Sequence, residues 1–100
     1  MDALAEFIEQ VHREPYHLLT NNCYQKHSRV VRRARDLGHA ARLMACIALL
    51  PTRPLPLLVP HFYAEVDNRV VDVAMDPVME AWAYRNDQVL KLAPIEMPLN

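Results

Sequence analysis

Residues 61–74, with the sequence HFYAEVDNRVVDVA, decide the fold. Two segments rich in β-branched and aromatic residues flank the dipeptide at 67–68, which is Asp-Asn. Such segments favour strands, and a two-residue loop of Asp and Asn favours a type I′ turn because both residues tolerate positive φ angles. The stretch therefore predicts a β-hairpin in which Val66 lies opposite Arg69.

The same register brings two reactive side chains to one face of the hairpin. Counting back from the turn places Tyr63 opposite Asp72 and His61 opposite Ala74. His61 and Asp72 then become diagonal neighbours, which lie about 7–8 Å apart and within reach of longer side chains. A carboxylate beside an imidazole orients the ring and holds it in one tautomer. The hairpin therefore predicts that Asp72 orients His61 for a role as a general base.

A helix is expected upstream, over residues 23–37. Its apolar face repeats every three or four positions, as is typical of an amphipathic helix. That face carries Cys23, His27, Val30, Ala34 and Leu37, and the opposite face carries Gln25, Lys26, Arg29, Arg32, Arg33 and Asp36. Gly38 follows at the position where a left-handed residue usually ends a helix.

Cys23 is the first residue of this helix, where a thiol ionises most readily. Unpaired N–H groups and the helix dipole favour the thiolate at such a position. His61 could serve as the base for this nucleophile, and Asp72 could orient the imidazole. Asp76, just beyond the hairpin, is the fallback for the orienting carboxylate. From the residues alone, the sequence offers a Cys-His-Asp triad as one interpretation and a buried core cysteine as the other.

The loop before the helix offers donors for an oxyanion hole. The first backbone N–H of the helix can supply one hydrogen bond to a tetrahedral intermediate. Asn22, Asn21 or His17 could supply the second. Tyr63 and Trp82 are the candidates for lining a substrate cleft, although a single aromatic residue on a helix more often belongs to the core.

The remaining segments are shorter. Residues 3–13 have helical periodicity, whereas 40–50 form a continuous apolar run that fits either a helix or a strand buried on both faces. Residues 51–60 hold four prolines and predict an extended connector. The Asp-Pro pair at 76–77 predicts the start of a short helix, and 88–92 can form a last strand.

The order of these segments resembles the transglutaminase-like branch of the papain-like cysteine peptidase superfamily. Members of that branch have a cysteine that opens a helix, as Cys23 does. Their small-residue strand of the G-x-x-A-R kind matches 38–42, and their H-A-W-V-E-V strand matches 61–66. Their strand ending in Val-Asp-Pro-Thr matches the chain up to 76–77. The resemblance covers about residues 20–77.

The resemblance implies a role for each matching residue. Cys23 takes the place of the nucleophile and His61 that of the base. Asp72 matches the acid of members with a short hairpin, while Asp76 matches the Asp-Pro of longer members. The resemblance also implies that residues 40–50 form a strand. The expected fold is α+β, a papain-like core in which the nucleophile helix packs on a small antiparallel sheet.

The expected function follows from the same resemblance. It is cysteine-dependent acyl transfer or hydrolysis of an amide in a peptide or isopeptide bond, with a peptide or protein substrate and no cofactor. Tyr63 replaces the usual tryptophan of the family, and Val78 replaces the threonine that follows Asp-Pro. Because the chain is short, a larger protein partner could supply part of the substrate cleft.

Composition sets outer limits on these expectations. A chain of 100 residues fits one domain, so 1–100 is expected to be a single unit. The net charge of −1 predicts no general attraction to nucleic acid or membranes. The longest apolar run, 43–51, is shorter than the roughly 20 residues that span a bilayer. Two cysteines and an acidic, amphipathic N-terminus favour the cytoplasm.

The sequence also allows two other functions and a metal site. A fold that has lost catalysis would act as an interaction module. An RNA-contacting domain would use Lys26, Arg29, Arg32, Arg33 and Arg35, but no nucleic-acid motif accompanies these residues. A metal site would draw on His17, Cys23, His27 and His61. No close ligand pair such as C-x-x-C is present, so no metal is expected.

Overall fold

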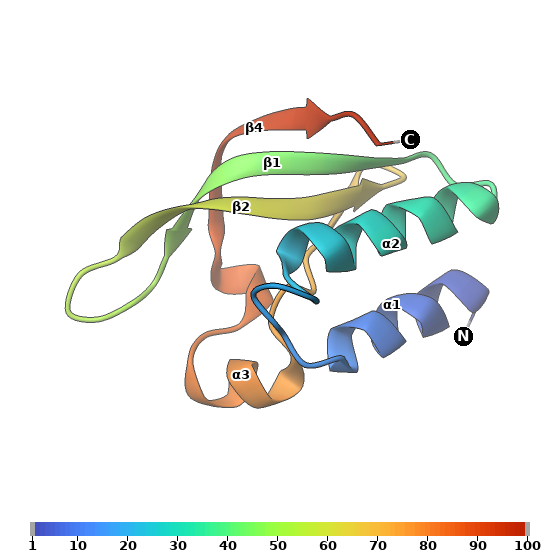
Figure 1. The fold of residues 1–100 in the computed structure, drawn as a ribbon. Helices are drawn as coiled ribbons and strands as arrows, with labels where there is room; N and C mark the ends of the chain where they lie inside the picture. Colours follow the sequence, from blue (N-terminus) through green and yellow to red (C-terminus); the bar gives the residue numbers. More distant parts are fainter. Residues whose placement is uncertain (1, 100) are drawn as a thin grey trace.

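The chain folds as an α+β unit in which helices cover part of one antiparallel sheet (Figure 1). The structure is a computed structural model that describes residues 2–99. Within these residues the helices are α1 (Ala3–Arg13), α2 (Cys23–Asp36) and α3 (Pro77–Trp82), with a 3-10 turn, η1, at Asn86–Gln88. The strands are β1 (Ala41–Leu50), β2 (Leu57–Val66), β3 (Arg69–Val71) and β4 (Leu90–Met97).

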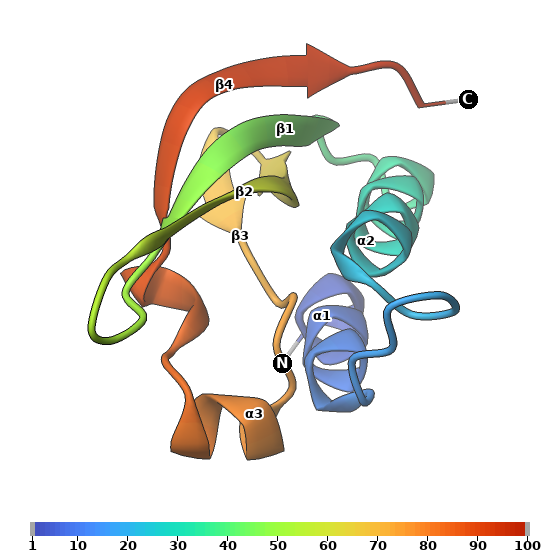
Figure 2. The same ribbon diagram turned by 60° about the vertical axis from the view of Figure 1, so that its left-hand side comes forward.

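The sheet has the strand order β3-β2-β1-β4, and all neighbouring strands are antiparallel. Helices α1 and α2 lie together on one side of it, as Figure 2 shows, with α2 against β1 and β2. The core between them is aliphatic and includes Val11, Val30, Val31, Leu43 and Ala64. Burying these side chains is the main force that holds α2, and with it Cys23, against the sheet.

The hairpin forms with the predicted turn. Asp67 and Asn68 have φ angles of 51° and 64°, as a type I′ turn requires, and Val66 pairs with Arg69. The prediction was wrong farther from the turn, because β3 ends at Val71 and pairs no residue beyond Ala64. Asp72 therefore leaves the ladder at the point where it turns toward His61.

Strand β2 starts earlier than the sequence predicts. Residues 57–60, expected to belong to the connector, continue the strand, and Pro60 pairs with Ile47 of β1. A proline is tolerated here because β3 stops opposite Ala64, so no described strand pairs with the outer edge of β2 at Pro60. The missing N–H thus removes no bond from the sheet.

Two other strand predictions have different outcomes. The run expected at 40–50 is a strand, β1, despite the helix propensity of its residues. The last strand was predicted at 88–92, but β4 covers Leu90–Met97 and lies along β1. The pairing shifts between Ala45 and Ile47, near Ala93 at a φ of 49°. This shift is a β-bulge, and it lets β4 continue beyond Pro94. Hydrophobic periodicity alone does not predict such a bulge.

Helix α2 starts at Cys23 as predicted and ends at Asp36, one residue before the predicted end, but the prediction assigned Lys26 to the wrong face. Lys26, expected on the basic exposed face, is completely buried. Its Nζ donates to the carbonyl oxygens of Glu14, at 3.0 Å, and Ala74, at 3.2 Å. Burial lowers the pKa of Lys26. The long side chain allows the ammonium group to reach these carbonyls, so Lys26 links α2 to two separate segments.

Two of the arginines of α2, Arg29 and Arg35, also have partners within the protein. Arg29 forms two hydrogen bonds with the Glu14 carboxylate, at 2.8 and 2.7 Å. Arg35 donates to the carbonyl oxygens of Ala41 and Leu99. These hydrogen bonds join α2 to the segments that contain Glu14, Ala41 and Leu99.

Replacing Lys26 by methionine tests this linking role. Lys26→Met keeps the aliphatic volume but leaves two carbonyl oxygens without their donor, so we expect a loss of about 2 to 4 kcal/mol in unfolding free energy. Urea denaturation measures it. Arg33→Met, at an exposed position of the same helix, is the control and should change stability by less than about 0.5 kcal/mol. Equal stability of the two variants would contradict the role.

Candidate active site

Cys23 lies at the N-terminus of α2, where a capping box fixes the first turn. The Asn22 side chain accepts from the Gln25 N–H, and the Gln25 side chain accepts from the Asn22 N–H. The first N–H groups of a helix have no acceptor within it, so those of Cys23 and Tyr24 face outward from the helix end. The Tyr24 ring packs edge-on against Phe62 of β2, with centroids 5.2 Å apart. This contact brings the helix start to the strand.

His61 and Asp72 form a buried pair next to Cys23. His61 Nε2 lies 2.8 Å from Asp72 Oδ2, and the two side chains are only 9% and 5% exposed. Burial alone would lower the pKa of His61, but its interactions with Asp72 and Cys23 raise that pKa to about 9. Burial would also raise the pKa of Asp72, whereas the hydrogen bond from His61 and the nearby positive charges hold it well below its ordinary value.

The thiol of Cys23 is shifted toward its ionised form. Burial disfavours the thiolate, but polar interactions with the His61 ring and with the backbone N–H of Phe62 outweigh it and lower the pKa of Cys23. Because Nε2 of His61 is engaged by Asp72, Nδ1 is the ring nitrogen that remains for the thiol. A lowered thiol pKa beside a raised imidazole pKa favours a thiolate–imidazolium pair at neutral pH.

His27, one turn along α2 from Cys23, is a fully buried neutral histidine. Its Nδ1 lies 2.7 Å from the Cys23 carbonyl oxygen, and its Nε2 lies 2.9 Å from the Val73 N–H. Nε2 must accept from that N–H, so Nδ1 carries the proton and donates it to the carbonyl. Burial lowers the pKa of His27 to about 4. His27 therefore ties the start of α2 to the segment that carries Asp72.

Lys91 of β4 is a member of the site that the sequence analysis missed. Its Nζ lies 2.9 Å from Asp72 Oδ2 and 3.2 Å from the Val89 carbonyl oxygen, and it stands 5.2 Å from the centre of the Tyr63 ring. Lys91 therefore helps to keep the Asp72 carboxylate ionised. No motif or spacing marks this residue, because it reaches Asp72 only through the pairing of β4 with β1.

The three predicted oxyanion donors lie outside the cavity wall. Asn22 donates its amide to the Leu18 carbonyl oxygen, and Asn21 donates to Glu14 and to the Pro15 carbonyl oxygen. His17 belongs to the exposed loop, where its backbone pairs with that of Asn21. Their side-chain groups thus shape the loop that leads into α2.

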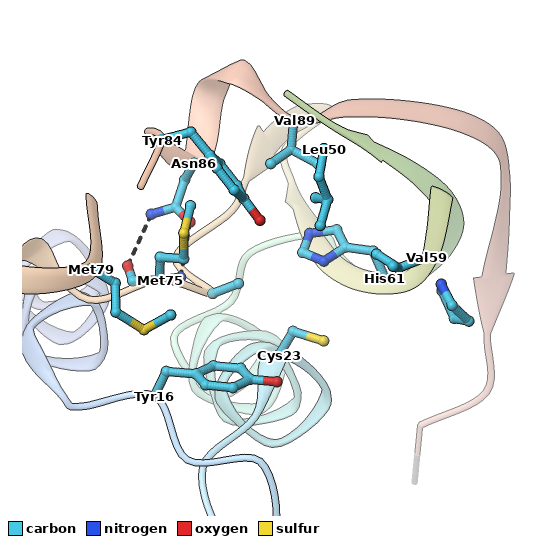
Figure 3. A pocket seen from close by; sticks show the side chains of 12 residues that line it. Tyr16, Cys23, Leu50, Val59, His61, Met75, Met79, Tyr84, Asn86 and Val89 are labelled. Atoms are coloured by element: carbon cyan, nitrogen blue, oxygen red, sulfur yellow. Dashed lines mark hydrogen bonds between the residues drawn. The ribbon is translucent and has the colours of Figure 1, made fainter. Parts of the chain in front are cut away.

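A cavity of about 240 Å³ opens beside the thiol (Figure 3). Tyr16 lies next to Cys23 in its wall, which the sequence analysis did not foresee. Burial, followed by the negative charge of Cys23, raises the pKa of Tyr16 and keeps its hydroxyl protonated. Among residues 2–99, the wall consists of Tyr16, Cys23, Leu50, Val59, Pro60, His61, Ala74, Met75, Met79, Tyr84, Asn86 and Val89.

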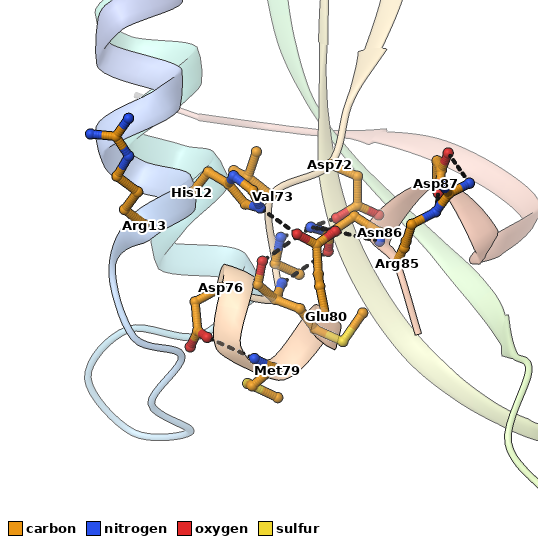
Figure 4. Close-up of polar contacts among 12 residues, drawn as sticks. His12, Arg13, Asp72, Val73, Asp76, Met79, Glu80, Arg85, Asn86 and Asp87 are labelled. Carbon is orange, nitrogen blue, oxygen red and sulfur yellow. Dashed lines mark hydrogen bonds and ion pairs between the residues drawn. The ribbon is translucent and has the colours of Figure 1, made fainter. Parts of the chain in front are cut away.

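Asp76, the fallback for the orienting carboxylate, has a different position (Figure 4). It is the N-cap of α3, accepting from the Met79 N–H at 2.9 Å, and its other oxygen accepts from the Tyr16 N–H at 2.9 Å. Asp76 thus fixes the backbone of Tyr16 at the cavity. Of the two carboxylates, it is Asp72 that contacts His61.

A second polar cluster holds α3 and the turn after it in place (Figure 4). Glu80 binds His12 of α1 at 2.6 Å and accepts from both the backbone and the side-chain amide of Asn86. The Asn86 side chain also exchanges hydrogen bonds with the backbone of Met75. These bonds fix one wall of the cavity.

The two predicted cleft residues lie at different depths. Tyr63 is only 3% exposed and packs with Met44 and Cys46, with its ring stacked on that of His61 at 6.5 Å. Tyr63 therefore forms part of the buried surroundings of the His61 ring. Trp82 is 73% exposed on α3, so the interpretation of it as a core residue is wrong. Trp82 lines a separate hollow beside Pro51, and neither Trp82 nor Tyr63 is among the residues that line the cavity at Cys23.

Comparisons of the chain with protein-family models, with curated proteins and with solved structures found no match. Within residues 2–99, no group of three or more His, Cys, Asp or Glu side chains is arranged to hold a metal ion. None of the helices described is long and apolar enough to cross a membrane. The chemistry of the site therefore has to be inferred from its own geometry.

The buried neutral state of His27 predicts how stability changes with pH. Between pH 6.5 and about 4, the unfolded chain binds a proton that the folded protein excludes, so stability falls as the pH falls through this window. The expected loss is about 3 kcal/mol. The contribution of His61, whose pKa is raised, is fully present below pH 6.5 and stays constant in this window.

Urea denaturation at a series of pH values checks this prediction. His27→Gln, which keeps an acceptor for the Val73 N–H and cannot titrate, should give a flatter curve over the same window. His17→Gln, in the exposed loop, is the matched control and should keep the wild-type dependence. Parallel curves for wild type and His27→Gln would contradict a buried neutral histidine.

Proposed function

We propose that the protein catalyses cysteine-dependent acyl transfer or hydrolysis at an amide bond, with a core of the transglutaminase-like, papain-like type. The observation that supports this most strongly is the buried His61–Asp72 pair, whose imidazole shares a cavity wall with Cys23, together with a lowered thiol pKa and a raised imidazole pKa. A structural cysteine buried among apolar groups has the opposite shift, as Cys46 does.

The proposed reaction proceeds in two stages. The Cys23 thiolate attacks the amide carbonyl carbon, a C–S bond forms, and the carbonyl electron pair moves onto oxygen. The His61 imidazolium gives its proton to the departing amine as the C–N bond breaks and a thioester remains. His61 then takes a proton from water or from an acceptor amine, which attacks the thioester and releases Cys23 as thiolate. Asp72 acts as a positioning residue throughout.

The oxyanion of the tetrahedral intermediate needs donors near Cys23. The backbone N–H of Cys23, in the first turn of α2, is one. The Tyr16 hydroxyl is the second that we propose, since its side chain lies beside the thiol in the cavity wall and keeps its proton. Tyr16 thus replaces Asn22, Asn21 and His17 as the proposed second donor. The side-chain amides of Asn22 and Asn21 donate to backbone carbonyl oxygens of the loop, and His17 lies in that loop.

The substrate is proposed to be a peptide or protein, and the bond a peptide or isopeptide amide. The site lies at the surface end of α2, where Cys23 is half-buried and accessible through the cavity. Hydrolysis is proposed in preference to transfer because residues 2–99 offer little surface to hold an acceptor amine and exclude water. We also propose that a larger protein partner supplies further contacts when the substrate is long.

Alkylation kinetics test the activated thiol directly. At near-neutral pH, iodoacetamide should modify Cys23 at least about tenfold faster than free cysteine, because the thiolate is stabilised by its neighbours. His61→Ala should remove most of this advantage, and Asp72→Asn should reduce it by lowering the pKa of His61. Mass spectrometry of the modified protein assigns the rate to the residue.

Cys46→Ser is the matched control, since Cys46 is buried and burial raises its thiol pKa. This variant should react as the wild type does, whereas Cys23→Ser should lose the fast phase. The proposed function fails if Cys23 reacts no faster than free cysteine and if His61→Ala leaves its rate unchanged.

A further inference from the structure

The cavity next to Cys23 has a wall without charged side chains other than the catalytic pair itself. None of the described residues that line it is Lys, Arg, Asp or Glu. We infer that the cavity binds an uncharged, apolar side chain on the acyl part of the substrate, next to the bond that Cys23 attacks. This inference rests on the proposed function and adds the substrate class to it.

The apolar part of the wall comes from both the sheet and the helical segments. Leu50 and Val59 come from the paired ends of β1 and β2, Met79 comes from α3, and Val89 precedes β4. Figure 3 shows these side chains around the space beside the His61 ring. A substrate group that enters this space exchanges water for aliphatic contacts on several sides, which is favourable for an apolar group.

Apart from Cys23 and His61, the polar groups in the wall offer nothing for a charge to pair with. The Asn86 amide is already hydrogen-bonded to the backbone of Met75 and to Glu80. Among residues 2–99, the hydroxyls of Tyr16 and Tyr84 have no hydrogen-bond partner, and burial raises the pKa of both. Two neutral hydroxyls can bind a carbonyl or a hydroxyl group, but they do not neutralise a carboxylate or an ammonium group.

The size of the cavity limits what enters it. A volume of about 240 Å³ is below the roughly 300–1,000 Å³ of pockets that enclose a whole small ligand. It suits a single side chain of leucine, methionine or phenylalanine size, with the remainder of the substrate outside. The flexible side chains of Met75 and Met79 can adjust to groups of different shape.

Four reagents that differ only in the side chain test this preference. N-acetylated chloromethyl ketones of leucine, glutamine, glutamate and lysine alkylate a thiolate, which forms a C–S bond and displaces chloride. We expect the leucine reagent to modify Cys23 about tenfold or more faster than the glutamate and lysine reagents, with glutamine between them. Rates with free cysteine correct for the intrinsic reactivity of each reagent.

A charge placed in the wall should shift this preference. Met79→Lys adds an ammonium group to the cavity and should raise the rate of the glutamate reagent relative to the leucine reagent. Val78→Lys is the matched control, because Val78 is 74% exposed on the same helix and does not line the cavity. It should keep the wild-type order of rates.

Iodoacetamide, which carries no side chain, separates the two possible failures. If Cys23 reacts slowly with iodoacetamide, the proposed function fails, and the substrate class falls with it. If Cys23 reacts fast with iodoacetamide but equally fast with the leucine and glutamate reagents, the proposed function stands and the apolar preference is wrong. An unchanged ratio of rates in Met79→Lys would likewise overturn the cavity as the binding site.

Discussion

The short contact between the buried side chains of His61 and Asp72 is the interaction on which the rest of the site depends. A buried carboxylate needs partners, and those of Asp72 include the His61 ring, the Lys91 ammonium group and the Ala74 N–H. Each comes from a different part of the fold. The requirement to satisfy this one charge therefore fixes how β2, β4 and the segment after β3 meet.

The same constraint explains how Cys23 comes to lie beside the His61–Asp72 pair. β3 ends early, which frees Asp72 to leave the ladder and leaves the outer edge of β2 open where Cys23 approaches. His27 then joins the start of α2 to the backbone just after Asp72. Cys23, His61 and Asp72, the proposed nucleophile, base and positioning carboxylate, are thus held by elements that pack on one aliphatic core.

Local patterns predicted the parts of this fold that depend on neighbouring residues. The turn at 67–68, the pairing beside it and the start of α2 follow from backbone preferences and capping. Local patterns could not predict contacts between segments that are distant in the sequence. The burial of Lys26, the arrival of Lys91 at Asp72 and the position of Tyr16 beside the thiol all depend on packing that no spacing in the sequence records.

The charge state of His61 tests the central claim most directly. Nitrogen NMR of protein labelled at its five histidines, with His61→Gln to assign the signals, measures whether both ring nitrogens carry protons. At about pH 7.5, the thiolate–imidazolium pair predicts a doubly protonated His61 ring that titrates only near pH 9 and at lower pH in Cys23→Ser. A neutral His61 ring at this pH, unaffected by Cys23→Ser, would contradict an activated cysteine.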